Sequence, residues 1–291
     1  MVRQVLKGRC ARDTLTLDPP SLAEKLARLA TFGFSEQNFL GAPWIPLLFK
    51  LTPGRYRRRL ALNLLAASPH YFKRYPHYAS MARRQVLKEE HRRNVVSRRA
   101  ICEQILQPHL RSDMTVLDFG CGPGNLARRV ARHVERVIAL DVSCGAIACA
   151  KVLNGAENIA YLVNDGRTLS ALEDSSIDLI YSFAVVQHLS DELFDGFLRE
   201  FRRVLKPGGG VICHVALEDA ARQAESQQAD ASIRGRLEST FRLRMVYRPV
   251  AEVRRMIAGA GFSRPTVRPV SEICDVQDDI ASQHLLAFHR S

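Results

Sequence analysis

Beyond about residue 113, short apolar runs alternate with segments whose apolar residues recur at helical spacing. The apolar runs predict strands, namely residues 114–120, 136–143, 158–165, 177–186, 209–215, 264–270 and 283–290. The other segments predict helices, namely residues 125–134, 145–155, 191–205 and 250–262. Because strands alternate with helices and the apolar runs lack strict alternation, we predict βαβ units around a parallel sheet that is covered on both faces.

The N-terminal part of the chain has a different pattern. Residues 1–75 predict short helices, because prolines interrupt the helical spacing repeatedly between residues 43 and 69. A longer, charged helix is predicted over residues 80–106. The pattern therefore divides the chain into a basic helical extension, residues 1–75, and a main domain, residues 76–291.

The most informative stretch is VLDFGCGPGN at residues 116–125, where a run of apolar residues leads into three glycines. At the carboxyl end of a strand in a doubly wound sheet, glycines allow a tight turn and a close approach of the backbone to a ligand. The spacing is not G-x-G-x-x-G, because Asn125 stands at the sixth position, and no Gly-Lys-Ser/Thr follows as in a phosphate-binding loop. The pattern is D-x-G-x-G-x-G, formed by Asp118, Gly120, Gly122 and Gly124.

This stretch resembles the first motif of the class I S-adenosylmethionine-dependent methyltransferases. Five later features carry the same resemblance in the family's order, namely Asp141, Asp165 and the segments 178–189, 201–215 and 260–262. The resemblance covers roughly residues 76–291 and leaves residues 1–75 without a known family. It implies an α/β fold, with a doubly wound, mostly parallel seven-stranded sheet that has an antiparallel edge strand. It also implies methyltransferase activity with S-adenosylmethionine as the cofactor.

The resemblance places a cofactor site at the carboxyl ends of the strands, formed by Asp118, Gly120, Gly122, Gly124, Asp141, Val142, Asp165, Gly166 and Phe183. A carboxylate can accept hydrogen bonds from both ribose hydroxyls, so Asp141 is expected to bind the ribose rather than to cap a helix. Asp118 lies inside a strand, where we expect it to meet backbone N–H groups or the cofactor's ammonium and sulfonium. Asp165 is expected to accept from the adenine amino group, and an Asx-turn with Gly166 is the alternative.

Methyl transfer needs no fixed catalytic motif, because the cofactor carries the reactive sulfonium and the protein supplies proximity, alignment and sometimes a base. His188 is the candidate base, since it follows the fourth strand, where this family holds the acceptor; packing or backbone hydrogen bonding is the alternative. His214, at the end of the fifth strand, is a second candidate. No metal site is predicted, because the seven cysteines include no C-x-x-C motif.

The charge is unevenly distributed along the chain. The net charge of +12 divides into +14 over residues 1–111 and −2 over residues 112–291. This asymmetry indicates a surface for nucleic acid, membrane or an acidic ligand, or else only solvated helical faces. Aromatic residues accompany the arginines of RYRRR at residues 55–59, which suits an acidic, lipidic or planar acceptor, or a small helical core with a charged rim. A polar insert at about residues 217–249 suits a lid.

No apolar run is long enough for a transmembrane helix, and the first residues lack the apolar region of a secretory signal. Reduced thiols and a cytoplasmic location are therefore expected. We predict a methyltransferase that acts on a small organic acceptor at O, N or C and releases S-adenosylhomocysteine. An RNA- or protein-modifying methyltransferase that grips its target with the basic segment is the alternative. A non-catalytic cofactor-binding module is a third hypothesis, and the oligomeric state is left open.

Overall fold

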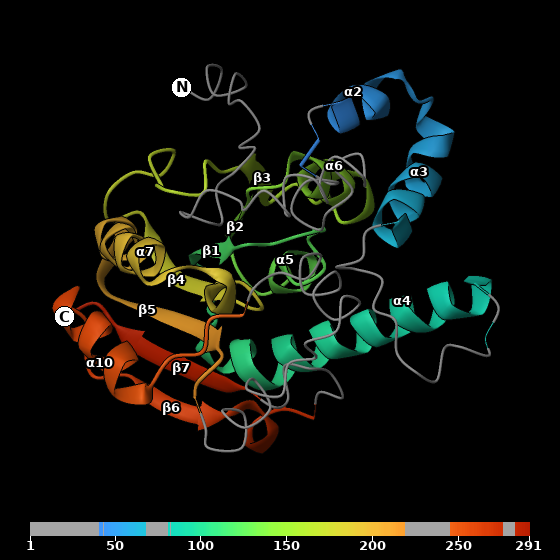
Figure 1. Ribbon diagram of the computed structural model, residues 1–291. Coiled ribbons are helices and arrows are strands. Elements are labelled where there is room, and N and C mark those ends of the chain that lie inside the picture. The colour runs from blue at the N-terminus through green and yellow to red at the C-terminus, as the bar shows by residue number, and fades with distance from the viewer. Residues whose placement is uncertain (1–40, 43, 68–80, 82, 219–244, 276–282) are drawn as a thin grey trace, which may run out of the picture.

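One seven-stranded sheet forms the centre of the protein (Figure 1). The computed structural model describes residues 41–42, 44–67, 81, 83–218, 245–275 and 283–291. The strands are β1 (Thr115–Phe119), β2 (Arg136–Asp141), β3 (Ile159–Val163), β4 (Ile177–Ser182), β5 (Leu205–Val215), β6 (Thr266–Pro269) and β7 (His284–His289). Their order is β3-β2-β1-β4-β5-β7-β6. Strands β1 to β5 are parallel, whereas β7 is antiparallel to both β5 and β6. The predicted doubly wound, mostly parallel sheet is confirmed.

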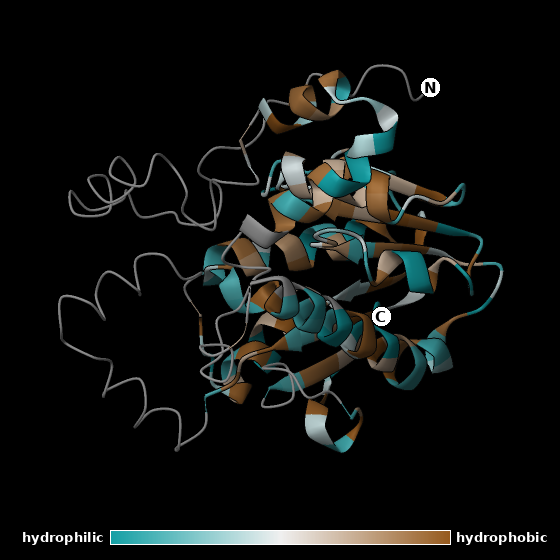
Figure 2. Cartoon of the chain, turned by 90° about the vertical axis from the view of Figure 1, so that its right-hand side faces the viewer, coloured by the Kyte–Doolittle hydropathy of each residue, from teal (hydrophilic) through white to brown (hydrophobic). Residues whose placement is uncertain are grey.

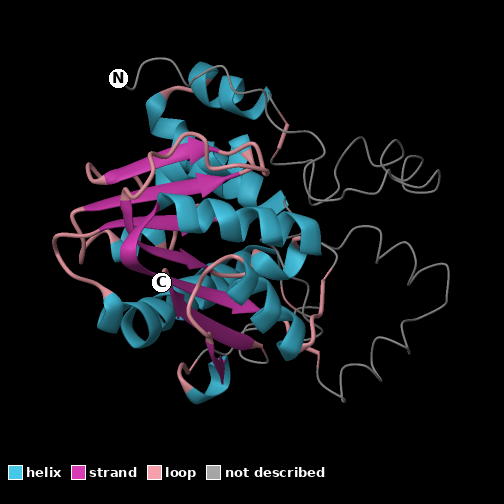
Figure 3. Cartoon of the chain, turned by 90° about the vertical axis from the view of Figure 1, so that its left-hand side faces the viewer, coloured by secondary structure: helices cyan, strands magenta, loops and turns pink. Residues whose placement is uncertain are grey.

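Helices cover both faces of this sheet (Figure 3). The α-helices of the described residues are α2 (Trp44–Leu51), α3 (Gly54–Ala67), α4 (Arg83–Ala100), α5 (Ala127–Val130), α6 (Cys144–Leu153), α7 (Asp191–Val204) and α10 (Val250–Gly259). Shorter turns are the π-helix η2 (Ile101–Leu106) and the 3-10 helices η3 (Gln107–His109), η4 (Val186–His188) and η5 (Val270–Glu272). Helices α7 and α10 pack on one face, and η2, α5 and α6 pack on the other.

The alternation of side chains along β1 shows why the strands lack a polar face. Val116 packs into the core layer with η2 and α5, whereas Leu117 and Phe119 pack against α7. Successive strand residues point to opposite faces, so a sheet covered on both sides needs apolar residues at nearly every position. Asp118 is the exception in β1, and by the same alternation it points to the face that η2 and α5 cover.

Three predicted elements differ from the structure. The strand predicted over residues 209–215 begins earlier, at Leu205, directly after α7. The helix predicted over residues 125–134 is helical only at Ala127–Val130. The strand predicted over residues 177–186 ends at Ser182, because Ala184 has a φ of +62°, a left-handed conformation that no strand accommodates. The charged helix predicted over residues 80–106 is confirmed, as α4 followed without a break by η2.

Of the extension, α2 and α3 are described, and they pack beside α6 (Figure 1). The side chains of α2 and α3 that are buried against Ala146 and Cys149 of α6 are those of Ile45, Phe49, Ala61 and Leu64. The predicted boundary at residue 75 and most of the insert at 217–249 lie outside the described residues.

Five cysteines of the described residues are free thiols, as expected, namely Cys102, Cys121, Cys149, Cys213 and Cys274. Cys144 departs from the expectation of reduced thiols, because it is disulfide-bonded. Within the part of the chain that the structure describes, no helix combines the length and the apolar character needed to cross a bilayer.

Candidate cofactor and acceptor site

The residues singled out in the sequence gather along one edge of the sheet. Strands β1 to β4 are adjacent and parallel, so the loops that follow them begin at the same edge. This arrangement brings together the candidates from four separate segments, namely Asp118 to Gly124, Asp141 and Val142, Asp165 and Gly166, and Phe183 with His188. Ligands of doubly wound sheets bind outside the carboxyl ends of the strands, near the point where the strand order reverses. Here that point lies between β1 and β4.

The glycine loop after β1 depends on left-handed backbone conformations. The φ angles are +80° at Gly120, +52° at Gly122 and +76° at Gly124. A Cβ atom on Gly120 would lie 2.1 Å from a methyl carbon of Val185, and one on Gly124 would lie 2.3 Å from the hydroxyl oxygen of Tyr161. At these two positions, therefore, glycine lets the loop pack against the chain's own side chains, in addition to any role toward a ligand.

Asp141, at the end of β2, joins the glycine loop to helix α6. One carboxylate oxygen accepts a hydrogen bond from the Gly122 N–H, and the other accepts one from the Ser143 N–H, both at 2.8 Å. Ser143 is the N-cap of α6, since its hydroxyl accepts from the Ala146 N–H. Ser143 therefore takes the N-cap role that was the alternative for Asp141, and the carboxylate of Asp141 is partly buried but keeps lone pairs that no described group uses. Burial raises its pKa, although the two N–H groups oppose the shift.

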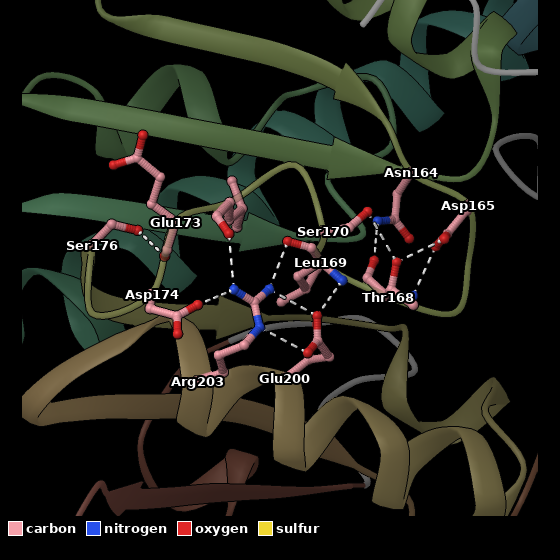
Figure 4. A network of polar contacts seen from close by, with 11 residues as sticks. Asn164, Asp165, Thr168, Leu169, Ser170, Glu173, Asp174, Ser176, Glu200 and Arg203 are labelled. Carbon is pink, nitrogen blue, oxygen red and sulfur yellow. Dashed lines mark hydrogen bonds and ion pairs between the residues drawn. The ribbon is translucent and has the colours of Figure 1, made fainter.

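Asp165 lies after β3 in a compact polar turn (Figure 4). Its carboxylate accepts from the backbone N–H groups of Arg167 and Thr168 and from the Thr168 hydroxyl, each at 2.8 Å. Gly166 instead donates its N–H to the side chain of Asn164, at 2.7 Å. Partial burial raises the pKa of Asp165, but these hydrogen bonds outweigh it and hold the pKa below its ordinary value. Asp165 therefore does take the alternative role in a turn, but its partners are Arg167 and Thr168 and not the expected Gly166.

Asp118 is the most unusual polar residue of the site. It is 3% exposed, and its Oδ2 atom has no hydrogen-bond partner in the described chain. Tyr181 lies opposite it on β4, yet the Tyr181 hydroxyl oxygen also lacks a partner of hydrogen-bond geometry there. The Nη1 atom of Arg98, from α4, is a third buried polar atom without such a partner. Buried polar atoms are nearly always paired, so this cluster has the character of a site for a polar ligand.

The protonation of Asp118 reflects the same surroundings. Burial raises its pKa to about 7, while the Tyr181 hydroxyl and the Arg98 guanidinium partly offset the shift. A cation placed beside the carboxyl would stabilise its charged form and lower the pKa again. Asp118 was identifiable from the glycine motif, whereas Arg98 and Tyr181 were not singled out, because Arg98 lies in no motif and Tyr181 lies in the segment 178–189 without an assigned role.

The turn after β4 is held by contacts from distant segments. The Ala184 N–H donates to Nδ1 of His214, at 3.3 Å, and the His214 ring stacks on Phe183 with ring centroids 6.4 Å apart. His214 is fully buried, so it supports the left-handed turn at Ala184. Phe183 is itself buried, and it packs in the layer beneath the turn.

Arg248 fixes the next turn, η4, against α7. Its guanidinium is 3% exposed, and it donates to the Val186 and Leu189 carbonyls and to Asp191. Within η4, His188 is half-exposed. Gln187 is 4% exposed, and its side-chain oxygen has no hydrogen-bond partner among the described residues. Sequence analysis singled out His188 but overlooked Gln187 beside it, although the same signal, position after the fourth strand, applied to both.

The polar groups of this edge fit S-adenosylmethionine. Asp141 retains acceptor capacity for a ribose diol, and the unpartnered Oδ2 atom of Asp118 and Nη1 atom of Arg98 match the two charges of an amino-acid group.

Comparisons with known proteins agree with this geometry. A family model described as a methyltransferase domain matches residues 117–213. An uncharacterized 37.1 kDa protein in transposon TN4556 of Streptomyces fradiae is 31% identical over 189 residues, which cover 62% of this chain and 52% of that protein. A malonyl-[acyl-carrier protein] O-methyltransferase of Yersinia pestis is 36% identical over 109 residues, 38% of each chain. The chain thus spans about half the length, or less, of these curated relatives.

Solved structures with low sequence identity share the fold. A chain of the Haloferax volcanii complex that contains the Trm112 methyltransferase activator superposes with a TM-score of 0.52 at 21% identity, over 70% of this chain and 91% of that one. An S-adenosylmethionine-dependent methyltransferase of Methanosarcina mazei gives a TM-score of 0.51 at 16% identity, over 64% and 96%. Residues 117–213 thus match a methyltransferase domain, and the strand order and the glycine loop have the arrangement expected of the class I S-adenosylmethionine-dependent methyltransferases.

Proposed function

We propose that this chain is an enzyme that transfers a methyl group from S-adenosylmethionine to a small organic acceptor at O, N or C, releasing S-adenosylhomocysteine. The observation that carries the proposal is the cluster of Asp118, Arg98 and Tyr181, in which each residue has a buried polar atom without a hydrogen-bond partner and Asp118 lies on the strand that leads into the glycine loop. When bound, the cofactor supplies a methyl group already activated by positive sulfur. The protein's contribution is binding, orientation and the exclusion of water.

In this proposal each polar residue at the carboxyl edge of the sheet binds a different part of the cofactor. Asp118 and Arg98 hold the ammonium and the carboxylate of its amino-acid end. Asp141 accepts from the ribose hydroxyls, and the glycine loop with Val142 lies along the cofactor. Asp165 and Gly166 line the adenine side, and Phe183, after β4, borders the cofactor on the other side of β1. The support for Asp118 is its orphaned Oδ2 atom, and for Asp141 it is a partly buried carboxylate already aligned by two backbone donors.

The acceptor side is proposed to be the turn after β4. His188 and Gln187 follow the strand next to β1, so they border the cofactor loops. Gln187 can orient a polar acceptor group through its unpaired oxygen, and His188 is the candidate that removes a proton from the acceptor. The relatives named above include an O-methyltransferase, which supports an oxygen acceptor as one member of the proposed class.

Calorimetry of the full chain with S-adenosylmethionine and with S-adenosylhomocysteine tests the proposal. We expect binding of both, and an Asp141→Asn variant should bind about ten-fold or more weakly, because charge-assisted hydrogen bonds contribute about 1.5–3 kcal/mol each. Asp141→Asn should also lower stability slightly, since one of its two backbone donors loses an acceptor.

Asp195→Asn is the matched control, because Asp195 lies on the exposed side of α7 in a surface pair with Arg199. Its affinity should equal that of the unmodified chain. Absence of binding to either compound would contradict the proposal, and equal affinity of Asp141→Asn and Asp195→Asn would place the ribose elsewhere.

A further inference from the structure

Helix α2 is apolar on two opposite sides, of which the described residues pack against α6 through only one. Ile45 and Phe49 pack against α6, whereas Trp44, Leu47 and Leu51 are 50%, 54% and 73% exposed. The three exposed residues stand at i, i+3 and i+7, so they form one stripe along the helix. A helix that is apolar all round is normally buried on all sides. This exposed stripe therefore indicates a surface that contacts something apolar, and Figure 2 shows α2 as a predominantly hydrophobic segment.

A cluster of cations, most of them on the adjoining helix α3, follows the stripe along the chain. Residues 41–67 contain five basic and no acidic residues, and the basic ones are Lys50, Arg55, Arg57, Arg58 and Arg59. All five are exposed. Tyr56 and Leu62 add exposed apolar surface at 47% and 41%, and the Arg55 guanidinium lies 4.8 Å from the centre of the Tyr56 ring. We call the stripe of α2 and the cations of residues 50–59 together the hairpin surface.

The residues that lead into α2 contact the first residue of α6. The Cys144 sulfur, at the first residue of α6, lies 3.4 Å from the Gly41 carbonyl oxygen and 3.6 Å from that of Ala42. Cys144 follows Asp141 by three residues. The chain that leads into α2 therefore lies close to the carboxyl edge of the sheet.

We propose that the hairpin surface docks on an anionic lipid bilayer. Large apolar and aromatic side chains beside arginines are the composition of helices that lie in a membrane interface. There the stripe of α2 enters the boundary of the acyl chains, and the arginines contact the headgroup phosphates of anionic lipids. Docking concerns this surface alone and does not depend on methyl transfer.

Two other occupants fit the hairpin surface less well. A polynucleotide would satisfy the arginines, but bases stack on aromatic rings and gain little from Leu47 and Leu51. A second copy of this chain would cover the stripe, but it would bring two sets of five cations together with no acidic residue on either hairpin. The bilayer is the partner that complements both the apolar and the charged parts.

Flotation of the full chain with lipid vesicles, in the absence of cofactor, tests the proposal. The chain should float with vesicles of phosphatidylcholine mixed with phosphatidylglycerol and remain unbound to phosphatidylcholine alone. Binding should weaken as salt rises, because exposed charges are screened. Arg57→Glu with Arg58→Glu should weaken binding about ten-fold or more. Leu47→Ser with Leu51→Ser should leave weaker binding that high salt abolishes.

Two pairs of substitutions outside the hairpin are the matched controls. Arg264→Glu with Arg268→Glu makes the same change of charge on exposed residues near β6, and Val95→Ser with Val96→Ser removes exposed apolar side chains from α4. Both should bind the mixed vesicles like the unmodified chain. Equal binding to phosphatidylcholine alone would overturn the proposal. So would hairpin variants that bind like the controls, tighter binding to a polynucleotide than to the vesicles, or a dimer that the leucine substitutions disperse.

Discussion

The two halves of the candidate site are built in different ways. On the cofactor half, the contacts of Asp165 are local, because it bonds to residues two and three positions later, and Asp141 combines a local bond to Ser143 with one to Gly122, 19 residues earlier. On the acceptor half, His214 supports Ala184 from 30 residues away, and Arg248 reaches Val186 across 62 residues. Local contacts leave a readable pattern in the sequence, whereas long-range contacts do not. The comparison teaches that the acceptor half depends on the whole fold, and changes there should affect turnover before they affect cofactor affinity.

The largest expected effect is the dependence of folding stability on pH that Asp118 causes. Because its folded pKa of about 7 lies above the ordinary value of 3.8, the folded ligand-free chain retains a proton that the unfolded chain releases. The stability that this protonated form contributes is therefore fully present below about pH 4 and is lost as the pH rises toward 7, by about 4 kcal/mol in all. Asp118→Asn should remove this slope from urea unfolding curves measured along the pH range.

The same substitution should weaken binding of S-adenosylmethionine, which separates a ligand role from a structural one. At neutral pH Asp118→Asn is expected to be more stable than the unmodified chain but poorer at binding. A variant with the original pH slope would show that Asp118 is ionised in the ligand-free protein.

Gly120→Ala should destabilise the glycine loop by about 3 kcal/mol, from a left-handed backbone and a collision with Val185. Gly208→Ala is the matched control, since Gly208 has a φ of +76° but no atom within 4 Å of the added Cβ. The Gly208→Ala variant should lose only about 1 kcal/mol of unfolding free energy. The difference between the two, measured by chemical unfolding, isolates the collision, and adding Val185→Ala to Gly120→Ala should recover part of it.

Arg248→Gln should destabilise the acceptor half by about 2–3 kcal/mol, because two buried carbonyls lose a charged donor. Turnover should fall more than cofactor affinity, since η4 moves while the loops after β1 and β2 keep their contacts. Arg255→Gln, which removes an exposed pair with Glu252, should change neither quantity measurably. Loss of affinity equal to the loss of turnover would show that the two halves are not separable.

Asp165→Asn should have the smallest effect, about 1 kcal/mol of stability, because the turn retains part of its hydrogen bonding. Cofactor binding should weaken only slightly, as most of the carboxylate's bonds lie within the turn. Thermal unfolding and calorimetry on the same preparation measure both quantities. A large loss of affinity with unchanged stability would instead assign Asp165 chiefly to the adenine.

The sequence by itself determined the order and type of most elements of the main domain and the position of the glycine loop. It could do so because apolar periodicity and glycine spacing are local consequences of backbone geometry. Asp118, Asp141 and Asp165 were identifiable for the same reason, since Asp118 interrupts an apolar run, Asp141 ends one and Asp165 stands shortly after one.

Only the tertiary structure decided how the remaining groups combine. It placed Arg98 and Tyr181 beside Asp118 and turned the chain at Ala184 above His214. It also left one side of α2 exposed while burying the other. Each of these depends on which distant segments share a surface. Burial and pairing belong to the packed chain and not to any residue's neighbours in sequence, so no local pattern could have contained them.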